Sequence, residues 1–273
     1  MEALRIRPLT RAIGAEVDGL DLREPPGDAV RAALLAALDR HLVLRFRDQP
    51  LSPEALLAFG RRLAPLRVHP FAPHHPDHAE LVVIDQVEPE GEGADEWHAD
   101  ATFLADPPRF GVLQAVRLPD VGGDTLFASA IAACAALSAP LRALLARLSA
   151  VHDLSAQLEG AIERGTSALD LRRMQERWPP FAHPIVRVHP ATGLPALFVN
   201  RNYTTRIEGL AEDESEALLA FLLAHLRSPK FQVRVRWEPG TIVVWDNHFA
   251  QHFAVPDYGE RRVMHRLNLS SPG

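Results

Sequence analysis

Short runs of β-branched and aromatic residues, separated by turn residues, recur along this chain and limit what it can fold into. The clearest is 232–237, where apolar and polar residues alternate with period two, as in a strand with one buried face. Other strand-like runs are 4–8, 41–46, 81–87, 110–118, 123–127, 184–189, 196–200, 240–245 and 263–269. So many short strands with turns between them indicate a double sheet of the jelly-roll type.

Helical segments lie mostly between or after these runs. They are predicted at 28–40, 52–63, 130–137, 139–148 and 212–226. Ser52 is expected to cap the second helix, with Pro53 at its first position, and Ser129 and Ser138 are expected to cap the next two. The predicted fold class is therefore α+β, with a double-stranded β-helix (jelly-roll) core and peripheral helices.

Residues 1–273 are expected to form a single domain, because neither a repeat nor a low-complexity tract divides them. Residues 153–180 differ from the rest: they are polar, poor in β-branched residues and end in Trp-Pro-Pro. We interpret 153–180 as an insertion or lid over a site.

Composition excludes several classes of protein. The net charge of −6 shows no basic footprint for nucleic acid, and the one cysteine, Cys134, excludes an intrachain disulfide and suggests a buried apolar role. No run approaches the roughly 18 apolar residues of a membrane-spanning helix. The first residues lack an apolar leader segment. A cytoplasmic protein without nucleic-acid or membrane partners is expected.

The first chemical signal is a histidine and an aspartate two residues apart. In extended chain, His98 and Asp100 point the same way and can reach one ion. A third ligand is offered by His248 or His252, but in a strand four residues span about 13 Å, so only one of the two can reach the same ion. The spacing alone does not decide between them.

Two histidines and one carboxylate leave coordination positions open, as in sites where iron(II) activates oxygen. A structural zinc site normally needs four protein ligands, usually including cysteine, which disfavours it in a chain with one cysteine. Catalytic zinc stays an alternative.

Two arginines near the C-terminus indicate an anionic ligand. Arg262 and Arg266 are four residues apart, so in a strand they share one face, and His265 lies on the other. Guanidinium groups bind carboxylates and similar oxyanions in bidentate fashion, so an inward pair predicts one or two anions. The alternative is that this face is solvated.

Motifs along nearly the whole chain resemble the taurine dioxygenase family of Fe(II)- and 2-oxoglutarate-dependent oxygenases, which includes alkylsulfatases and aryloxyalkanoate dioxygenases. The matching segments are 13–17, 97–103, 122–127, 183–190, 197–200, 203–207, 245–252 and 261–266. The resemblance implies a jelly-roll fold, Fe(II) as cofactor and 2-oxoglutarate as co-substrate. It also implies oxidation of a small organic substrate by dioxygen, with release of succinate and CO2.

The resemblance also assigns roles to particular residues. It makes His252, rather than His248, the third metal ligand beside His98 and Asp100. Thr125 matches a threonine that binds 2-oxoglutarate, and Arg262 matches the arginine that pairs with its distal carboxylate.

On the substrate side, Arg266 and His69 match residues that bind the anionic group, and Ala101 and Tyr203 match pocket positions. Several pocket positions differ from the taurine enzyme. These are Ala72 in place of tyrosine, Ala94 in place of asparagine, Ala101 in place of valine, and Tyr203 in place of the usual phenylalanine. The substitutions at 72 and 94 enlarge the pocket and remove hydrogen-bonding groups.

The resulting hypothesis is hydroxylation of a small anionic organosulfonate, either taurine or a bulkier one, whose product collapses to an aldehyde and sulfite. One alternative is the same chemistry on an alkyl sulfate ester or aryloxyalkanoate. A remote alternative is a non-catalytic, cupin-like metal-binding protein. Members of the family are often dimers or tetramers, so a homo-oligomer is expected.

Overall fold

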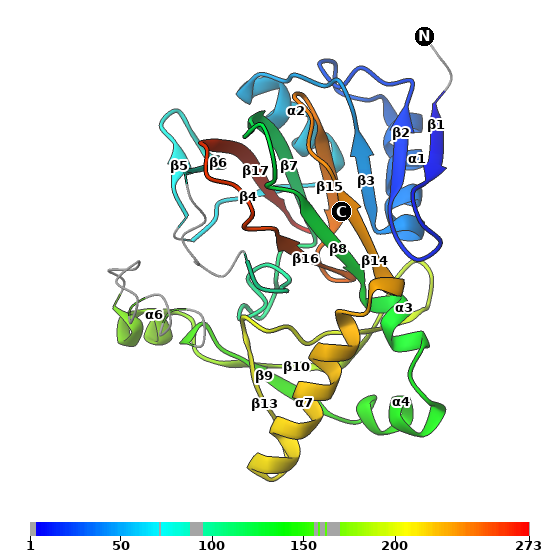
Figure 1. Ribbon diagram of the computed structural model, residues 1–273, viewed down its shortest axis with the longest axis vertical. Coiled ribbons are helices and arrows are strands. Elements are labelled where there is room, and N and C mark those ends of the chain that lie inside the picture. The colour runs from blue at the N-terminus through cyan, green and yellow to red at the C-terminus, as the bar shows by residue number, and fades with distance from the viewer. Residues whose placement is uncertain are drawn as a thin grey trace.

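A large sheet dominates the computed structural model, which describes residues 4–70, 72–87, 95–155, 158, 162 and 170–272 (Figure 1). Its strands in spatial order are β1 (Arg5–Pro8), β2 (Ala15–Asp18), β3 (Val43–Phe46), β15 (Ile242–Asp246), β7 (Phe110–Arg117), β17 (Arg262–Leu269), β6 (His78–Gln86) and β5 (His74–His75), with β4 (Leu66–Arg67) paired to β17. Most neighbours are antiparallel, and β2 and β3 form a parallel pair.

A second, smaller sheet packs against the inner face of the first. It consists of β14 (Gln232–Val235), β8 (Thr125–Ser129) and β16 (Ala250–Ala254), in that order. Phe127 of β8 contacts Trp245 of β15 with 5.7 Å between ring centroids, and both side chains lie in the largest apolar core cluster. The two sheets therefore enclose a common core, as the alternating strand pattern predicts.

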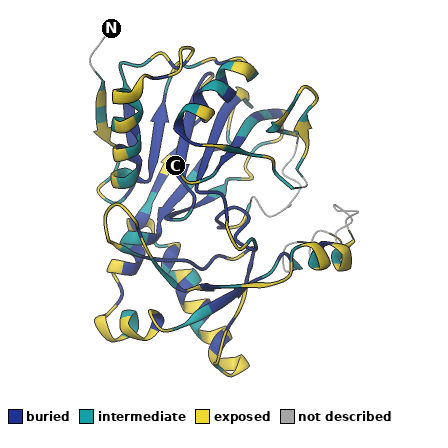
Figure 2. Cartoon of the chain, turned by 180° about the vertical axis from the view of Figure 1, so that it is seen from behind, coloured by how far each residue is buried: buried dark blue, intermediate teal, exposed yellow. Residues whose placement is uncertain are grey.

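Helices lie outside the two sheets, and the first two in the chain pack on the large one. They are α1 (Asp28–His41), α2 (Pro53–Leu63), α3 (Ala130–Ala135), α4 (Ala139–Leu145), α6 (Leu171–Arg177) and α7 (Glu212–Leu226), with a short 3-10 turn, Pro229–Phe231. Leu38 of α1 and Phe59 of α2 are fully buried beneath the large sheet. Figure 2 shows the buried strands and the exposed outer faces of the helices. Within the described residues, no helix has both the length and the apolar character needed to cross a membrane.

A further group of strands lies at the other end of the molecule, beside α7 (Figure 1). There β9 (Ser149–His152) is flanked by β10 (Phe181–Pro184) and β13 (Thr204–Ile207), and β11 (Val186–Val188) pairs with β12 (Pro195–Leu197). The described elements thus confirm a fold of mixed sheets and helices.

The helix predictions were confirmed in position, and all three predicted serines are N-cap residues, two of them with a side-chain hydrogen bond. Ser52 accepts a hydrogen bond from the Ala55 N–H, and Ser129 from the Ala132 N–H. Ser138 is the N-cap residue of α4 as predicted, but its side chain makes no capping hydrogen bond. Pro140, in the first turn of α4, has no N–H to offer there.

Three strands near the site were not predicted: β9, β13 and β16. The helix expected to reach 148 ends at Leu145, and β9 begins at Ser149. β16 carries two adjacent polar residues that point to opposite faces: His252 joins the metal cluster, and Gln251 donates to the Val199 carbonyl. The strand therefore lacks the usual alternation of apolar and polar residues. Polar functional residues within a strand break the sequence pattern from which strands are predicted.

We predict that Gly111→Ala lowers the free energy of unfolding by about 3 kcal/mol, because it overpacks the core. Gly111 lies opposite Trp245 in the sheet, and a Cβ on it would stand 2.1 Å from the indole Cζ2. Gly259→Ala is the control, since nothing lies within 4 Å of its added Cβ. Urea unfolding of both variants measures the difference, and equal stabilities would contradict this account of the strand pair.

Candidate metal centre

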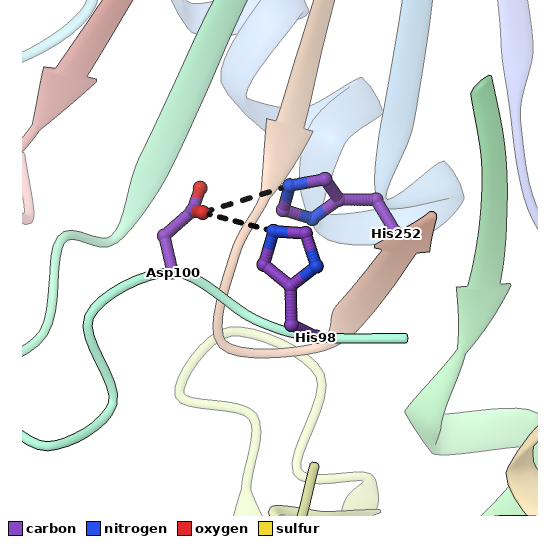
Figure 3. A group of neighbouring side chains, drawn as sticks. All are labelled: His98, Asp100 and His252. Atoms are coloured by element: carbon purple, nitrogen blue, oxygen red, sulfur yellow. Dashed lines mark ion pairs between the residues drawn. The ribbon is translucent and has the colours of Figure 1, made fainter. Parts of the chain in front are cut away.

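Three buried side chains, His98, Asp100 and His252, converge at the end of the smaller sheet. Their candidate ligand atoms all lie within 4.8 Å of one another. Asp100 Oδ1 lies 3.5 Å from Nε2 of His98 and 3.6 Å from Nε2 of His252. Figure 3 shows both imidazoles turned toward the carboxylate. This is the only group of at least three such side chains found among the described residues.

Backbone pairing brings these segments together. His98 forms an isolated antiparallel bridge with His252 of β16: each donates its N–H to the carbonyl of the other, at 3.0 and 2.8 Å. The two imidazoles consequently lie side by side, with 4.1 Å between ring centroids. The expectation that His98 and Asp100 approach the site from extended chain is confirmed for His98, whereas the backbone turns at Asp100.

The hydrogen bonding and charges of these side chains suit metal binding. The Nδ1–H of His98 donates to the Glu96 carbonyl at 2.7 Å, which leaves Nε2 with its lone pair toward Asp100. Burial and the neighbouring His98 hold the pKa of His252 well below its ordinary value, so its imidazole is neutral. Burial would raise the pKa of Asp100, but the positive charge of Arg266, together with the neighbouring imidazoles, outweighs it and keeps that pKa well below the usual range.

His248, the other candidate third ligand, points elsewhere. Its Nε2–H donates to the Pro107 carbonyl at 3.1 Å, and its ring packs against Phe198. Burial and the charge of Arg187 lower its pKa to about 3, so it is neutral. His248 is thus a structural hydrogen-bond donor outside the cluster, and the choice of His252 is the one that this geometry allows.

The residues expected to bind the substrate lie beside this cluster. Arg266 forms an ion pair with Asp100 Oδ2. Burial and the Arg266 charge lower the pKa of His69 to about 4. His69 Nδ1 accepts the Ala72 N–H at 3.0 Å, so the neutral ring carries its proton on Nε2.

Tyr203 completes this wall, with its hydroxyl against the backbone amide of Ala101. Burial and the charge of Asp100 raise the pKa of Tyr203. The hydroxyl therefore accepts the amide hydrogen and keeps its own proton. The Tyr203 ring packs on Phe103, with 5.3 Å between centroids.

Residues 5–268 match the family model described as "Taurine catabolism dioxygenase TauD, TfdA family". The chain belongs to this family. It is 35% identical over 98% of its length to an alpha-ketoglutarate-dependent sulfate ester dioxygenase of Pseudomonas putida, covering 89% of that protein. It is 31% identical to an alpha-ketoglutarate-dependent sulfonate dioxygenase of Saccharomyces cerevisiae, over 98% of this chain and 66% of that one.

Solved structures agree. A taurine dioxygenase from Burkholderia xenovorans superposes with a TM-score of 0.84 at 33% identity, over 98% of this chain and 89% of that one. Because the resemblance spans the chain, this TauD/TfdA family member is a 2-oxoglutarate-dependent dioxygenase, an oxidoreductase. The named activities of its relatives differ in substrate, so the family alone leaves the substrate open.

The two residues expected to hold 2-oxoglutarate are both buried. The Thr125 hydroxyl accepts a hydrogen bond from the indole N–H of Trp237 at 3.0 Å, which fixes its rotamer. The Arg262 side chain lies against Gly123, where a Cβ would stand 3.1 Å from its Cδ, and beside the ring of Tyr258. Gly123 has φ of 71°, so two constraints, backbone conformation and space, both favour glycine there.

Sequence reasoning missed Trp237, Tyr258 and Asn247. Trp237 ends a strand-like run and reads as core. Tyr258 lies in a loop without pattern, and its role is visible only because the loop folds back onto Arg262. Asn247 is of a residue type common in turns, and a turn does lie there, but this does not account for its side chain. None of the three carries a spacing signal that links it to the site.

The described part of 153–180 packs beside the site. Leu154, Leu158 and Met174 form one apolar cluster with Phe103 and Tyr203. Ala94 and most of the stretch between Ser155 and Asp170 lie outside the described residues. The segment therefore contributes to the wall around Tyr203, and a lid role stays a prediction.

Buried histidines brace the loop that follows Asp100. The Nε2–H of His183 donates to the carbonyls of Thr102 and Leu104, at 2.9 and 3.0 Å. His152 Nδ1 is hydrogen-bonded to the Thr102 hydroxyl at 2.8 Å. Burial, together with nearby positive charge, lowers the pKa of His152 to about 3 and that of His183 to about 4.

These two histidines predict acid sensitivity. Unfolded histidine takes up a proton near pH 6.5, whereas in the folded protein His183 does so near 4 and His152 near 3. Between these values the unfolded state binds more protons, so the stability contribution is present above pH 6.5 and is lost as the pH falls. We expect a loss of about 1.4 kcal/mol per pH unit for each histidine.

The check is denaturant unfolding in the presence of a chelator, from pH 7.5 to 4.5, for wild type and His183→Gln. The glutamine amide keeps a donor near the Nε2 position but does not titrate. Its slope of unfolding free energy against pH should be smaller. An unchanged slope would show that His183 does not contribute.

Proposed function

We propose that this protein is an Fe(II)- and 2-oxoglutarate-dependent dioxygenase that oxidises a small organosulfonate. The observation that carries the proposal is the buried convergence of two imidazoles and one carboxylate on a common point. His98, Asp100 and His252 would hold the iron. The packing of the smaller sheet against the large one supports a double-stranded β-helix as the scaffold of this site.

This donor set fits Fe(II). Two imidazoles and one carboxylate leave several positions for exogenous ligands, which suits a metal that must bind a co-substrate and dioxygen. A structural zinc site would require a fourth protein ligand, and none joins the three among the described residues. When bound, Fe(II) would supply the activation of dioxygen, which is the oxidant, while 2-oxoglutarate is oxidised to succinate and CO2.

The chain itself supplies binding and orientation. Arg262 would pair with the distal carboxylate of 2-oxoglutarate, and Thr125, fixed by Trp237, would donate to it. Burial lowers the pKa of the Arg262 guanidinium. The neighbouring Tyr258 opposes this shift but does not cancel it. A buried guanidinium gains most from an anionic partner, which supports this role.

We expect that Fe(II) and 2-oxoglutarate, added without oxygen, produce the weak visible charge-transfer band of a metal-bound 2-oxo acid. His252→Ala removes a ligand and Arg262→Ala removes the carboxylate clamp, so neither variant should form the band.

His248→Ala is the matched control: it removes a histidine of the same segment that lies outside the cluster, and the band should persist. Wild-type protein with bound metal but no band would overturn the oxygenase proposal.

For the substrate, three groups near Asp100 can donate hydrogen bonds: the His69 Nε2–H, the Arg266 guanidinium and the Tyr203 hydroxyl. A sulfonate has three terminal oxygens, whereas a carboxylate has two. Three donors can give each sulfonate oxygen its own hydrogen bond, which supports a sulfur oxyanion as the substrate's anionic group. Hydroxylation of the carbon bonded to sulfur lets the C–S bond break, giving an aldehyde and sulfite.

An alkyl sulfate ester is the second candidate. It presents the same –SO3 group to the same donors, but its reacting carbon lies one oxygen atom farther from the sulfur. The small side chain of Ala72, whose backbone N–H bonds His69, leaves room for a longer substrate. A sulfate ester dioxygenase is also among the chain's relatives.

A panel of taurine, longer alkylsulfonates and alkyl sulfates distinguishes these candidates by the product, sulfite or sulfate. Tyr203→Phe should raise KM for the preferred oxyanion about tenfold, because it removes one donor to a charged group, and should change kcat less. Loss of kcat with unchanged KM would contradict a binding role for Tyr203.

A further inference from the structure

Asn247 makes three hydrogen bonds around the metal ligand Asp100. The Asp100 N–H donates to its Oδ1 at 2.7 Å, and its Nδ2 donates to the carbonyls of Asp100 and Pro108, at 3.1 and 2.9 Å. The side chain is buried, with 1% of the residue exposed. Since one neighbour offers a hydrogen and two offer oxygens, only one orientation of the amide satisfies all three.

The backbone of Asn247 is itself held in place by its neighbours. Asn247 donates its backbone N–H to the Arg109 carbonyl at 2.8 Å. The preceding residue, Asp246, is fully buried; it accepts the His248 N–H at 3.1 Å and pairs with the Arg109 guanidinium at 2.6 Å. The end of β15 is thus a rigid corner, and Asn247 transmits that rigidity to Asp100.

The chain beyond Asp100 takes an unfavourable turn. Ala101 has φ of 49°, in the left-handed region that residues other than glycine rarely adopt. The turn is closed by the Leu104 N–H, which donates to the Ala101 carbonyl at 3.0 Å. Left to itself, Ala101 would favour another conformation and carry Asp100 away from the imidazoles.

We propose that Asn247 is a positioning residue for the metal site: its amide holds both backbone groups of Asp100 and so maintains the left-handed turn at Ala101. The inference rests on the proposed metal-binding function and deepens it. Asn247 reaches no ligand atom, and its effect passes through the Asp100 backbone. No covalent step is involved.

The experiment titrates Mn²⁺ alone into the full-length protein by calorimetry, with thermal melting of the same samples. Asn247→Ala should weaken Mn²⁺ binding 10- to 100-fold, the usual range for residues that orient metal ligands. Asn247→Ser is the milder variant if the alanine protein does not fold, because its hydroxyl can hydrogen-bond a water molecule in the vacated space. It should also weaken Mn²⁺ binding.

Gln49→Ala is the matched control. Gln49 also makes three amide hydrogen bonds to backbone: it accepts the Leu22 N–H at 2.8 Å and donates to the Leu20 and Arg47 carbonyls, each at 3.0 Å. These partners belong to the N-terminal segments and not to the loop that carries Asp100. Its loss should lower the melting temperature while changing the Mn²⁺ Kd less than twofold.

A rescue variant separates positioning from simple packing. Glycine adopts the left-handed conformation without the penalty of a Cβ, so Ala101→Gly in the Asn247→Ala background should recover part of the lost Mn²⁺ affinity. The same change in wild type should alter the affinity little, because the turn is already held.

The outcomes are distinct. Wild-type protein that binds no Mn²⁺ overturns the proposed metal site and this inference with it. Wild-type binding with an unchanged Kd in the Asn247 variants overturns the inference alone. Equal weakening in Gln49→Ala, or no recovery with Ala101→Gly, also overturns it, since the loss is then one of general stability or packing.

Discussion

Two hydrogen bonds between the backbones of His98 and His252 join segments that are far apart in the chain, and the metal centre depends on them. Once this bridge forms, the imidazoles must lie side by side, and Asp100 follows two residues later. The geometry of the ligands is therefore a property of strand pairing, which is strong and directional, more than of side-chain preference. The rest of the site is built outward from this bridge.

Charge balance then explains the residues around it. Asp100 and Arg266 neutralise each other, and the lowered pKa of His252 keeps that ring neutral. In the proposed complex, the divalent metal and Arg262 add three positive charges. Doubly charged 2-oxoglutarate and a singly charged sulfonate supply three negative ones. A buried site that is balanced only when every component is present disfavours partial occupancy and the side reactions that accompany it.

Much of this arrangement was predictable from sequence, and the exceptions have physical reasons. α2 and α7 carry regular helical patterns, and α7 lies where it was expected. The three ligands follow from residue type, spacing and family resemblance. β16 was missed because it carries polar residues on both faces, His252 at the site and Gln251 bonded to the Val199 carbonyl.

Side-chain bonds that cross between distant segments were not predictable either. The Asn247 clamp joins residues that no periodicity relates, and the left-handed turn at Ala101 occupies a position where sequence rules would expect glycine. The packing of Tyr258 near Arg262 depends on the path of a loop. Such contacts follow from the tertiary structure, and only afterwards can the residues be seen to suit them.

The contact between Gly111 and Trp245 restricts how this protein can change over generations. The indole fills the space above the glycine and also contacts the ring of His252, with 5.1 Å between centroids. A lineage cannot enlarge residue 111 first without displacing the indole; it must first replace the tryptophan by a smaller side chain, and that step loosens the support of a metal ligand. The order of substitutions is therefore constrained, and neither residue of the pair is easily replaced alone.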